Sequence, residues 1–366
     1  MRRILAFEYN PRAMPDMPLF DLRCSRCGTA YPPEGFPEVC PVCESPWEQG
    51  PSLCWREPLA GEPGLRRWAH VLGLYPEELP DREIARPAAR FEGTWIAHQG
   101  SAPAGSYKER GAEVMMGAAM RRGIRELFLD SSGNAGIAVA RACAERGVRC
   151  TVLVPETTPE LKKERSRRWG ATVETIPGNR DATNLAARER RKRVPYGAPF
   201  FQPSFQAGVA TLAWDLFQEI AGPLPARWLV PVGNGPLLMG LGLGLEVLHR
   251  AGKIDRLPAL HAVQLEGYAS LHPEGPGTAA PGSPVAGGIA IGNPPRRADM
   301  RAWVERTGGD VTRVTEEEIA AARRALAEAG WPADPTGAAA FAGYLKRPDL
   351  REEGCVVVVT SREEAA

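Results

Sequence analysis

Lys108 is the residue whose neighbours in the sequence most clearly indicate a reactive side chain. It lies in Pro103-Ala-Gly-Ser-Tyr-Lys-Glu-Arg-Gly111, after a glycine-serine turn and before an apolar helical run, 112–120. The five other lysines lie in charged stretches that are typical of solvated helix faces or loops. A lysine amine held away from water loses its proton more easily, and the neutral amine can form a Schiff base with a carbonyl compound. The sequence therefore predicts that Lys108 is a covalent anchor.

Two loops further along each join a predicted strand to a predicted helix. The first is Ser131-Ser-Gly-Asn-Ala-Gly136. Its backbone amides, assisted by the helix dipole, are suited to binding a carboxylate. The side chain of Asn134 can form a hydrogen bond with a phenolic oxygen on a bound ring. The alternative is a tight turn in which Asn134 only caps the helix.

The second loop is Gly233-Asn-Gly-Pro-Leu-Leu-Met-Gly240. Its glycines allow the backbone to approach a phosphate closely, and the following helix stabilises the phosphate charge. Dinucleotide-binding folds also use a glycine-rich loop, but they place it in the first strand-to-helix turn. This loop lies late in the chain, which disfavours a dinucleotide.

Thr360 and Ser361 end the last apolar strand, 356–359, at the edge where parallel sheets place ligands. A hydroxyl there can contact a pyridine nitrogen without protonating it, which favours elimination and replacement reactions. The alternative is a strand-end turn without a ligand. Together, Lys108, the two loops and Thr360 provide an anchor for an aldehyde and contacts for a ring, a phosphate and a pyridine nitrogen. We therefore expect pyridoxal 5′-phosphate as the cofactor.

Four of the eight cysteines form two Cys-x-x-Cys pairs, Cys24 with Cys27 and Cys40 with Cys43. This spacing lets two turns present four thiolates to one tetrahedral zinc ion, as in a zinc ribbon. Four protein ligands leave no open position, so the predicted role of the zinc is structural. The alternative is four free thiols in a loop.

The rest of the pattern indicates how these residues are positioned. Continuous apolar strands alternate with helices, which indicates parallel sheets covered on both faces. Residues 51–100 show little regular pattern. The predicted strands are 126–130, 148–154, 172–176, one near Phe200, 228–232, 260–265 and 356–359. The predicted helices are 65–73, 135–146, 160–169, 182–193, 207–220, 237–250, 316–329 and 338–345.

Composition limits the class of protein. With 366 residues, 43% of them hydrophobic, the chain can form two substantial domains. The net charge of +1 argues against nucleic acid or a membrane surface as the general partner. We expect a cytoplasmic protein, because the sequence shows neither a signal peptide nor an apolar run long enough to cross a membrane.

From about residue 90 onwards, the sequence resembles the fold-type II pyridoxal-phosphate enzymes, and among them the threonine synthases most. Lys108 matches the Schiff-base lysine of the family motif, Asn134 the asparagine beside the phenolic oxygen, and Thr360 the hydroxyl at the pyridine nitrogen. Residues 286–294 and 334–338 resemble segments that are typical of threonine synthases. The phosphate loop of the family is matched by Gly233, Asn234, Gly235 and Leu237.

The resemblance implies an α/β fold of the tryptophan synthase β type, with two doubly wound parallel-sheet domains and an N-terminal zinc ribbon. We expect the ribbon at 20–50, a small domain at 111–204, and a large cofactor-binding domain from 51–110 and 205–366. We also expect a homodimer.

The sequence departs from the family at three places. The family stretch Gly-x-Thr-Pro-Leu is not recognisable, and Phe91 to Thr94 is its nearest remnant. Ala135 stands where many threonine synthases have a threonine whose hydroxyl helps to bind the substrate, and Ser361 replaces a glycine. The candidate substrate-binding residues are Ser131, Ser132, Gly133 and Ala135.

The resemblance therefore implies a pyridoxal-phosphate-dependent carbon-oxygen lyase or synthase acting on a small amino acid. The threonine synthase reaction converts O-phosphohomoserine and water to threonine and phosphate. One alternative is β-elimination or β-replacement on serine-like or threonine-like substrates. Another is a non-catalytic binding protein that uses the ribbon to dock a partner. The intact Lys108, Asn134 and Thr360 favour catalysis.

Overall fold

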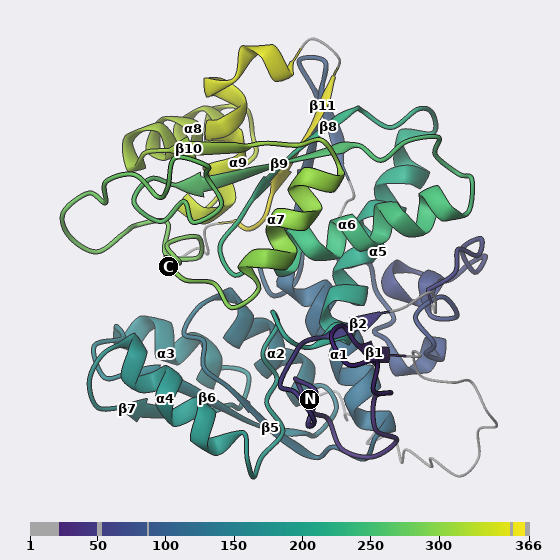
Figure 1. Ribbon diagram of the computed structural model, residues 1–366, viewed down its shortest axis with the longest axis vertical. Helices are drawn as coiled ribbons and strands as arrows, with labels where there is room; N and C mark the ends of the chain where they lie inside the picture. The colour runs from purple at the N-terminus through teal and green to yellow at the C-terminus, as the bar shows by residue number, and fades with distance from the viewer. Residues whose placement is uncertain (1–21, 50–52, 86–87, 352–353, 363–366) are drawn as a thin grey trace, which may run out of the picture.

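Two largely parallel sheets and one short hairpin organise the chain (Figure 1). The structure is a computed structural model that describes residues 22–49, 53–85, 88–351 and 354–362. The ends of the predicted ribbon, residues 20–21 and 50, therefore lie outside the described residues. In Figure 1 the three-stranded sheet occupies the lower half and the six-stranded sheet the upper half.

The six-stranded sheet has the order β10-β9-β8-β11-β4-β3, and only the β3–β4 pair is antiparallel. The last strand along the chain, β11, lies in the interior of the sheet, with Val357 paired to Ile96 on one side and Leu229 on the other. The strands are β3 (Ala89–Phe91), β4 (Thr94–His98), β8 (Arg227–Pro231), β9 (Ala259–Leu265), β10 (Val311–Val314) and β11 (Cys355–Val359).

Helices cover both faces of this sheet, which explains why β11 is apolar at every position. Val356 and Val358 belong to one hydrophobic core, to which α5 and α6 contribute. Val357 and Val359 point into a second core, to which α8 and α9 contribute. The helices are α5 (Pro203–Ile220), α6 (Pro236–Arg250), α7 (Arg297–Arg306), α8 (Glu316–Glu328) and α9 (Pro335–Lys346).

The three-stranded sheet, β5-β6-β7, is parallel throughout. Its strands are β5 (Glu126–Leu129), β6 (Arg149–Pro155) and β7 (Thr172–Ile176). Its helices are α2 (Asn134–Ala144), α3 (Glu160–Arg167) and α4 (Arg180–Arg190).

Helix α1 (Lys108–Arg121) packs against both α2 and α5, and so joins the two sheets. Glycine permits its close approach to α5: a Cβ on Gly208 would lie 2.3 Å from the carbonyl oxygen of Arg110. A Cβ on Gly111 would likewise lie 2.4 Å from the ring of Phe205. A larger side chain at either position would push the helices apart, and with them the start of α1.

The hairpin of β1 (Leu22–Cys24) and β2 (Trp47–Gln49) is antiparallel and carries the four-cysteine segment. The α/β class, the parallel sheets and this cysteine-bearing hairpin confirm the predicted fold class. We keep the domain boundaries at residues 110 and 205 as a proposal.

Some predicted elements were wrong. Phe200 lies in a turn rather than a strand, with its ring 4.7 Å from that of Phe201. The neighbouring Tyr196 instead forms a parallel bridge with Phe128 at β5. The predicted helix at 65–73 is a short 3-10 helix, Gly64–Trp68, followed by turns.

The sequence pattern also missed β3, β4, α7 and β10. Strands β3 and β4 contain only three and five residues, in a region whose glycine, proline and arginine content hides alternation. Strand β10 has four residues and lies at the sheet edge, where an apolar run is not required.

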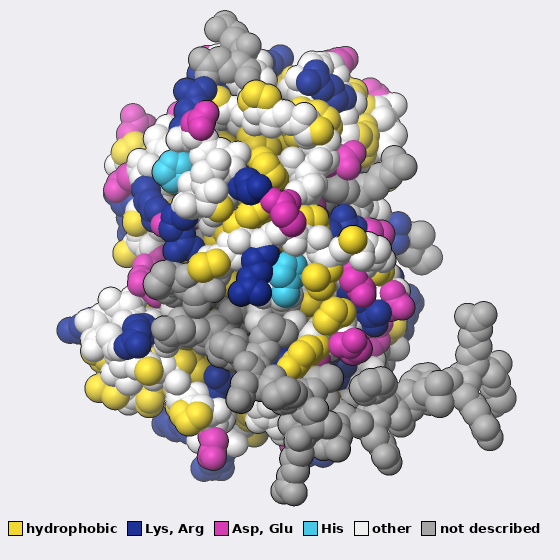
Figure 2. All heavy atoms as spheres, turned by 90° about the vertical axis from the view of Figure 1, so that its right-hand side faces the viewer, with side chains coloured by type: hydrophobic (Ala, Val, Ile, Leu, Met, Phe, Trp, Pro, Cys, Tyr) yellow, Lys and Arg dark blue, Asp and Glu magenta, His cyan; other side chains and the backbone are white. Residues whose placement is uncertain are grey.

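In the described part of the chain, no helix has the length and hydropathy needed to cross a membrane. Figure 2 shows one face of the molecule, where Lys and Arg side chains are interspersed with Asp and Glu. This mixture agrees with the near-neutral net charge.

Candidate active site and metal centre

The segment that leads into Lys108 is joined directly to the end of β11. The backbone N–H of Tyr107 donates to the carbonyl oxygen of Thr360 at 2.9 Å, and Ser106 forms an antiparallel bridge with Ser361. The backbone N–H of Arg362 donates to Gly105 at 3.1 Å. Lys108 and Thr360, which are far apart in the sequence, therefore lie at the same carboxyl edge of the central strand.

The amine of Lys108 is half-buried at the first position of α1. Its Nζ atom donates a hydrogen bond to the hydroxyl of Tyr107 and lies 3.8 Å from the centre of that ring. Burial lowers the pKa of Lys108 to about 7, and the charge of Asp334 partly opposes this shift. The lowered pKa favours the neutral amine, which is the form that attacks an aldehyde.

Asn134 is the first residue of α2, and Gly133 occupies the N-cap position before it. The alternative in which Asn134 only caps the helix is therefore wrong. Instead, Asn134 Nδ2 donates to Asp334 Oδ2 at 3.3 Å. Asp334 lies at the N-cap of α9, where its other carboxylate oxygen accepts from the N–H of Gly337 at 2.6 Å.

The resemblance of residues 334–338 to threonine synthases did not indicate a role for Asp334. The start of α9 also packs on the end of β11, because a Cβ on Gly337 would lie 2.4 Å from the carbonyl oxygen of Ser361. The structure thus brings Lys108, Asn134 and Thr360 to the beginning of α9. A signal was present in the sequence: an Asp-Pro pair opening an apolar helix marks a capped helix start.

The other candidate residues of the first loop differ in exposure. Ser131 and Ser132 are half-buried, Gly133 is exposed and Ala135 is buried. Within the loop, the N–H of Gly133 donates to Ser131 Oγ at 3.4 Å.

Asp130, immediately before this loop, is a buried carboxylate that sequence reasoning missed. It accepts a hydrogen bond from the hydroxyl of Tyr196, and its Oδ2 atom lies 2.7 Å from a guanidinium nitrogen of Arg180. Burial raises the pKa of Asp130, while the charge of Arg180 opposes that rise. These contacts fix the position at which the loop leaves β5.

The glycine-rich loop begins α6. Gly235 is at the N-cap with a φ of 84°, in the left-handed region that favours glycine. A Cβ on Gly233 would lie 2.4 Å from the carbonyl oxygen of Gly288, so the segment 286–294 packs closely on this loop. Asn234 is half-buried and Leu237 is buried.

The same segment also reaches α9. The N–H of Gly288 donates to Thr336 Oγ1 at 3.2 Å, in the first turn of that helix. The segment 286–294 therefore connects the glycine-rich loop to the helix start that contacts Asn134.

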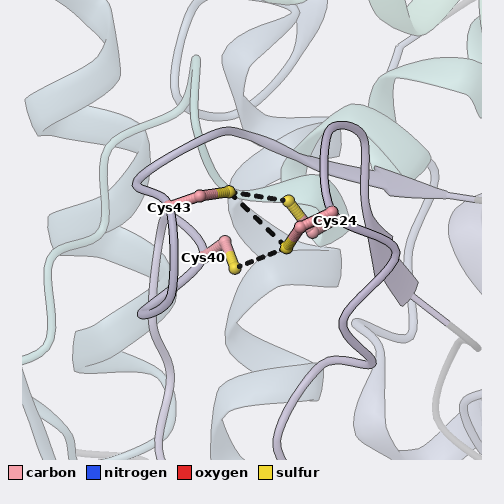
Figure 3. A group of neighbouring side chains, drawn as sticks. Cys24, Cys40 and Cys43 are labelled. Atoms are coloured by element: carbon pink, nitrogen blue, oxygen red, sulfur yellow. Dashed lines mark hydrogen bonds between the residues drawn. The ribbon is translucent and has the colours of Figure 1, made fainter.

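The four cysteines of the N-terminal hairpin form one cluster, with their Sγ atoms pointing toward one another (Figure 3). All four atoms lie within 4.8 Å of one another, and Cys24 to Cys43 is 3.4 Å. Four thiolates at about 2.3 Å from a tetrahedral zinc ion would be roughly 3.8 Å apart. The geometry therefore fits one metal ion better than four independent thiols.

Two similar turns present these thiols. The N–H of Gly28 donates to the carbonyl oxygen of Cys24 at 3.0 Å, and the N–H of Glu44 donates to Cys40 at 2.8 Å. Both Gly28 and Glu44 have positive φ. A glycine in the sequence therefore indicated the first turn, but the second turn has a glutamate at this position. A hydrogen bond with Thr29 lowers the pKa of Cys27 to about 6, whereas burial raises the pKa of Cys24 to about 11, so the thiols of the cluster differ in acidity.

The cysteine hairpin is attached to the body through buried or half-buried contacts. Arg122, after α1, donates to the carbonyl oxygen of Pro32 at 2.7 Å, and Arg191, after α4, pairs with Glu38 at 3.0 Å. Gln202 donates to the carbonyl oxygen of Phe36 at 3.4 Å and to that of Tyr196 at 2.9 Å. Because Tyr196 also contacts Asp130, these contacts lead from the hairpin to the first candidate loop.

Comparisons with known proteins agree with this arrangement. A family model described as "Pyridoxal-phosphate dependent enzyme" matches residues 87–361. A threonine synthase of Methanosarcina acetivorans is 27% identical, with 93% of this chain and 91% of that protein covered. One of Halalkalibacterium halodurans is 30% identical, with 77% of this chain and 84% of that protein covered.

Solved structures share the fold. A threonine deaminase isoform of Solanum lycopersicum has a TM-score of 0.63 at 21% identity, covering 74% of this chain and 75% of that chain. Maize serine racemase has a TM-score of 0.64 at 18% identity, covering 74% of this chain and 84% of that chain.

Proposed function

The chain belongs to the family of pyridoxal-phosphate dependent enzymes, and from this premise we propose that it is a carbon-oxygen lyase or synthase acting on a small amino acid. The observation that carries the proposal is Lys108, a half-buried residue whose amine has a pKa lowered to about 7, at the start of a helix whose preceding residue, Tyr107, donates its backbone N–H to Thr360 at the carboxyl edge of β11.

The residues present fit the cofactor. The hydroxyl of Ser106, next to the Lys108 segment, is buried and has no hydrogen-bond partner among the described residues. Lys108 would bind the aldehyde carbon, Asn134 the phenolic oxygen and Thr360 the pyridine nitrogen. The phosphate would be bound by the loop of Gly233, Asn234, Gly235 and Leu237.

Each side chain has a task in the proposed reaction. When bound, the cofactor withdraws electrons from the substrate α-carbon. Lys108, once its amine is free, accepts and returns protons at Cα and Cβ, which requires an amine whose pKa lies near the working pH. The loop of Ser131, Ser132, Gly133 and Ala135 would bind the substrate carboxylate.

We propose a threonine synthase-like reaction first: phosphate leaves Cγ of O-phosphohomoserine, and water adds at Cβ. The near full-length match to curated threonine synthases supports it. The second candidate is β-elimination or β-replacement on serine-like or threonine-like amino acids. Ala135 favours this candidate, because its methyl group cannot donate the hydrogen bond that a threonine there offers.

Purified protein with added cofactor would be assayed with O-phosphohomoserine, serine and threonine, while phosphate, threonine, ammonia and α-keto acids are measured. Phosphate and threonine formed in equal amounts support the first candidate; ammonia with a keto acid supports the second. Lys108→Ala should abolish either activity. If no substrate reacts although Lys108 carries the cofactor, the non-catalytic alternative gains support.

For the N-terminal segment we propose one structural zinc bound by Cys24, Cys27, Cys40 and Cys43. The cytoplasmic location and the homodimer also remain proposals.

A further inference from the structure

We propose that Asp334 is a positioning residue, which orients the amide of Asn134 and supplies the negative charge that balances the amine of Lys108. This inference rests on the proposed function, because it concerns two residues assigned there to the cofactor. It adds to that site a carboxylate at the start of α9, which packs on the six-stranded sheet, whereas Asn134 starts a helix of the three-stranded sheet.

The geometry gives each oxygen of the carboxylate its own partner. Oδ1 accepts from the N–H of Gly337 at 2.6 Å, which fixes the side chain at the start of α9. Oδ2 accepts from Asn134 Nδ2 at 3.3 Å, at the start of α2. Asp334 thereby connects a helix packed on the six-stranded sheet to a helix packed on the three-stranded sheet.

This contact also decides which way the Asn134 amide faces. An amide nitrogen carries two hydrogens, and both oxygens of the Asp334 carboxyl group accept hydrogen bonds here. Nδ2 must therefore point toward Asp334, and its second hydrogen is available for a phenolic oxygen on the cofactor. Without the carboxylate, the amide could rotate by half a turn and present its oxygen, which would repel a phenolate.

The charge of Asp334 acts on Lys108 as well. Burial favours the neutral amine, and the carboxylate is the group that opposes this effect. In the described part of the chain, the hydroxyl of Tyr107 contacts the amine, and burial raises the pKa of Tyr107, so this hydroxyl stays neutral. The start of α9 is a favourable place for the negative charge, because of the helix dipole.

The simpler explanation is that Asp334 only caps α9. Asp334→Asn separates the two roles, since asparagine caps helices about as well as aspartate and can still accept a hydrogen bond from Asn134, but has no charge. Asp334→Ala removes cap and charge together. The matched control is Thr315→Ala, which removes the cap of α8 on the same sheet, where Thr315 Oγ1 accepts from the N–H of Glu318.

The experiment measures capture of pyridoxal 5′-phosphate by cofactor-free protein as a function of pH, followed by the absorbance of the bound cofactor. Capture by the wild type should rise with pH around a midpoint near the Lys108 pKa of about 7. In Asp334→Asn, we expect the midpoint to fall by roughly one pH unit, because an attractive charge has been removed. Thr315→Ala should keep the wild-type midpoint while losing thermal stability.

A second readout tests the amide. Asp334→Ala should weaken cofactor binding by roughly tenfold, and Asn134→Ala should weaken it less in that background than in the wild type, since the amide is no longer oriented toward the phenolic oxygen.

An unchanged midpoint in Asp334→Asn, together with additive losses in the double variant, would overturn the inference and leave the proposed function intact. If borohydride fixes no cofactor on Lys108 in the wild type, both are overturned.

Discussion

At the scale of single residues, the amine of Lys108 depends on where its helix begins. The hydrogen bond from Tyr107 to Thr360 holds the first turn of α1 at the end of a fully buried strand. Burial at this place lowers the pKa of the amine to about 7, whereas an exposed lysine would remain charged. The position of the backbone therefore sets the chemistry of the side chain.

We predict that Lys108 is the residue that carries the cofactor. Reduction with borohydride should fix the cofactor on one peptide, the one that contains Lys108, and Lys108→Ala should lose this label. Peptide mapping by mass spectrometry makes the measurement. Lys163→Ala, a change on α3, is the control and should keep the label. Labelling at another lysine would contradict the assignment.

We predict that Ala135→Thr improves turnover of O-phosphohomoserine. A hydrogen bond to a charged group contributes about 1.5–3 kcal/mol, or roughly ten- to a hundredfold in binding. The wild type should therefore form threonine weakly, and the variant should have the higher kcat/KM. Ala135→Val, with similar size but no hydroxyl, should give no such gain. Efficient turnover with a low KM in the wild type would show that the missing hydroxyl is unimportant.

At the scale of elements, the site is built mainly from the starts of helices. Helices α1, α2, α6 and α9 begin at Lys108, Asn134, Pro236 and Pro335. The helix dipole gives each start a positive potential, which suits a ligand with a phosphate and a carboxylate. The cysteine hairpin is a separate element, but Gln202 and Tyr196 connect it to Asp130, just before the first loop.

We predict about one zinc ion per chain, lost in a Cys24→Ser, Cys27→Ser double variant. The loss should lower the thermal midpoint, because the hairpin has a core of few residues and needs the metal to stay folded. Cofactor capture at Lys108 should persist. The control is Cys54→Ser, an exposed cysteine outside the cluster, which should keep the zinc. Disulfides among the four cysteines in fresh protein, with no metal, would refute the site.

At the scale of the whole molecule, a buried ionic network joins segments that are distant in the sequence. Glu113 on α1 is fully buried and pairs with Arg146 at 2.7 Å and with Arg82 at 2.9 Å. Glu109, next to Lys108, pairs with Arg82 at 3.2 Å and also with Arg141 of α2. The network thus holds α1 against α2 and against the segment that precedes the six-stranded sheet.

We predict that Glu113→Ala destabilises the protein by about 3–5 kcal/mol, because it leaves Arg146 without its buried carboxylate and removes one of the carboxylates that pair with Arg82. Glu126→Ala, which breaks the exposed pair with Arg149, should cost about 1 kcal/mol or less. Thermal or urea unfolding of the two variants measures the difference. Equally small losses of stability in the two variants would show that water already screens the charges of the network.

Sequence alone determined the features that depend on neighbouring residues. The two Cys-x-x-Cys turns are local, and so are the alternation of apolar strands with helices and the glycine-rich start of α6. The bounds of β7, 172–176, agree in sequence and structure, and most other predicted helices and strands differ by only a few residues. Lys108 stood out for the same reason, since its setting is visible within nine residues.

Only the tertiary structure decided which distant groups meet. The central place of β11, the contact of Thr360 with Tyr107, and the pairing of Asn134 with Asp334 join residues more than 120 positions apart. The short strands β4 and β10 are likewise held by the neighbours with which they pair. Such pairings depend on how the whole chain packs, so a local sequence pattern does not indicate them.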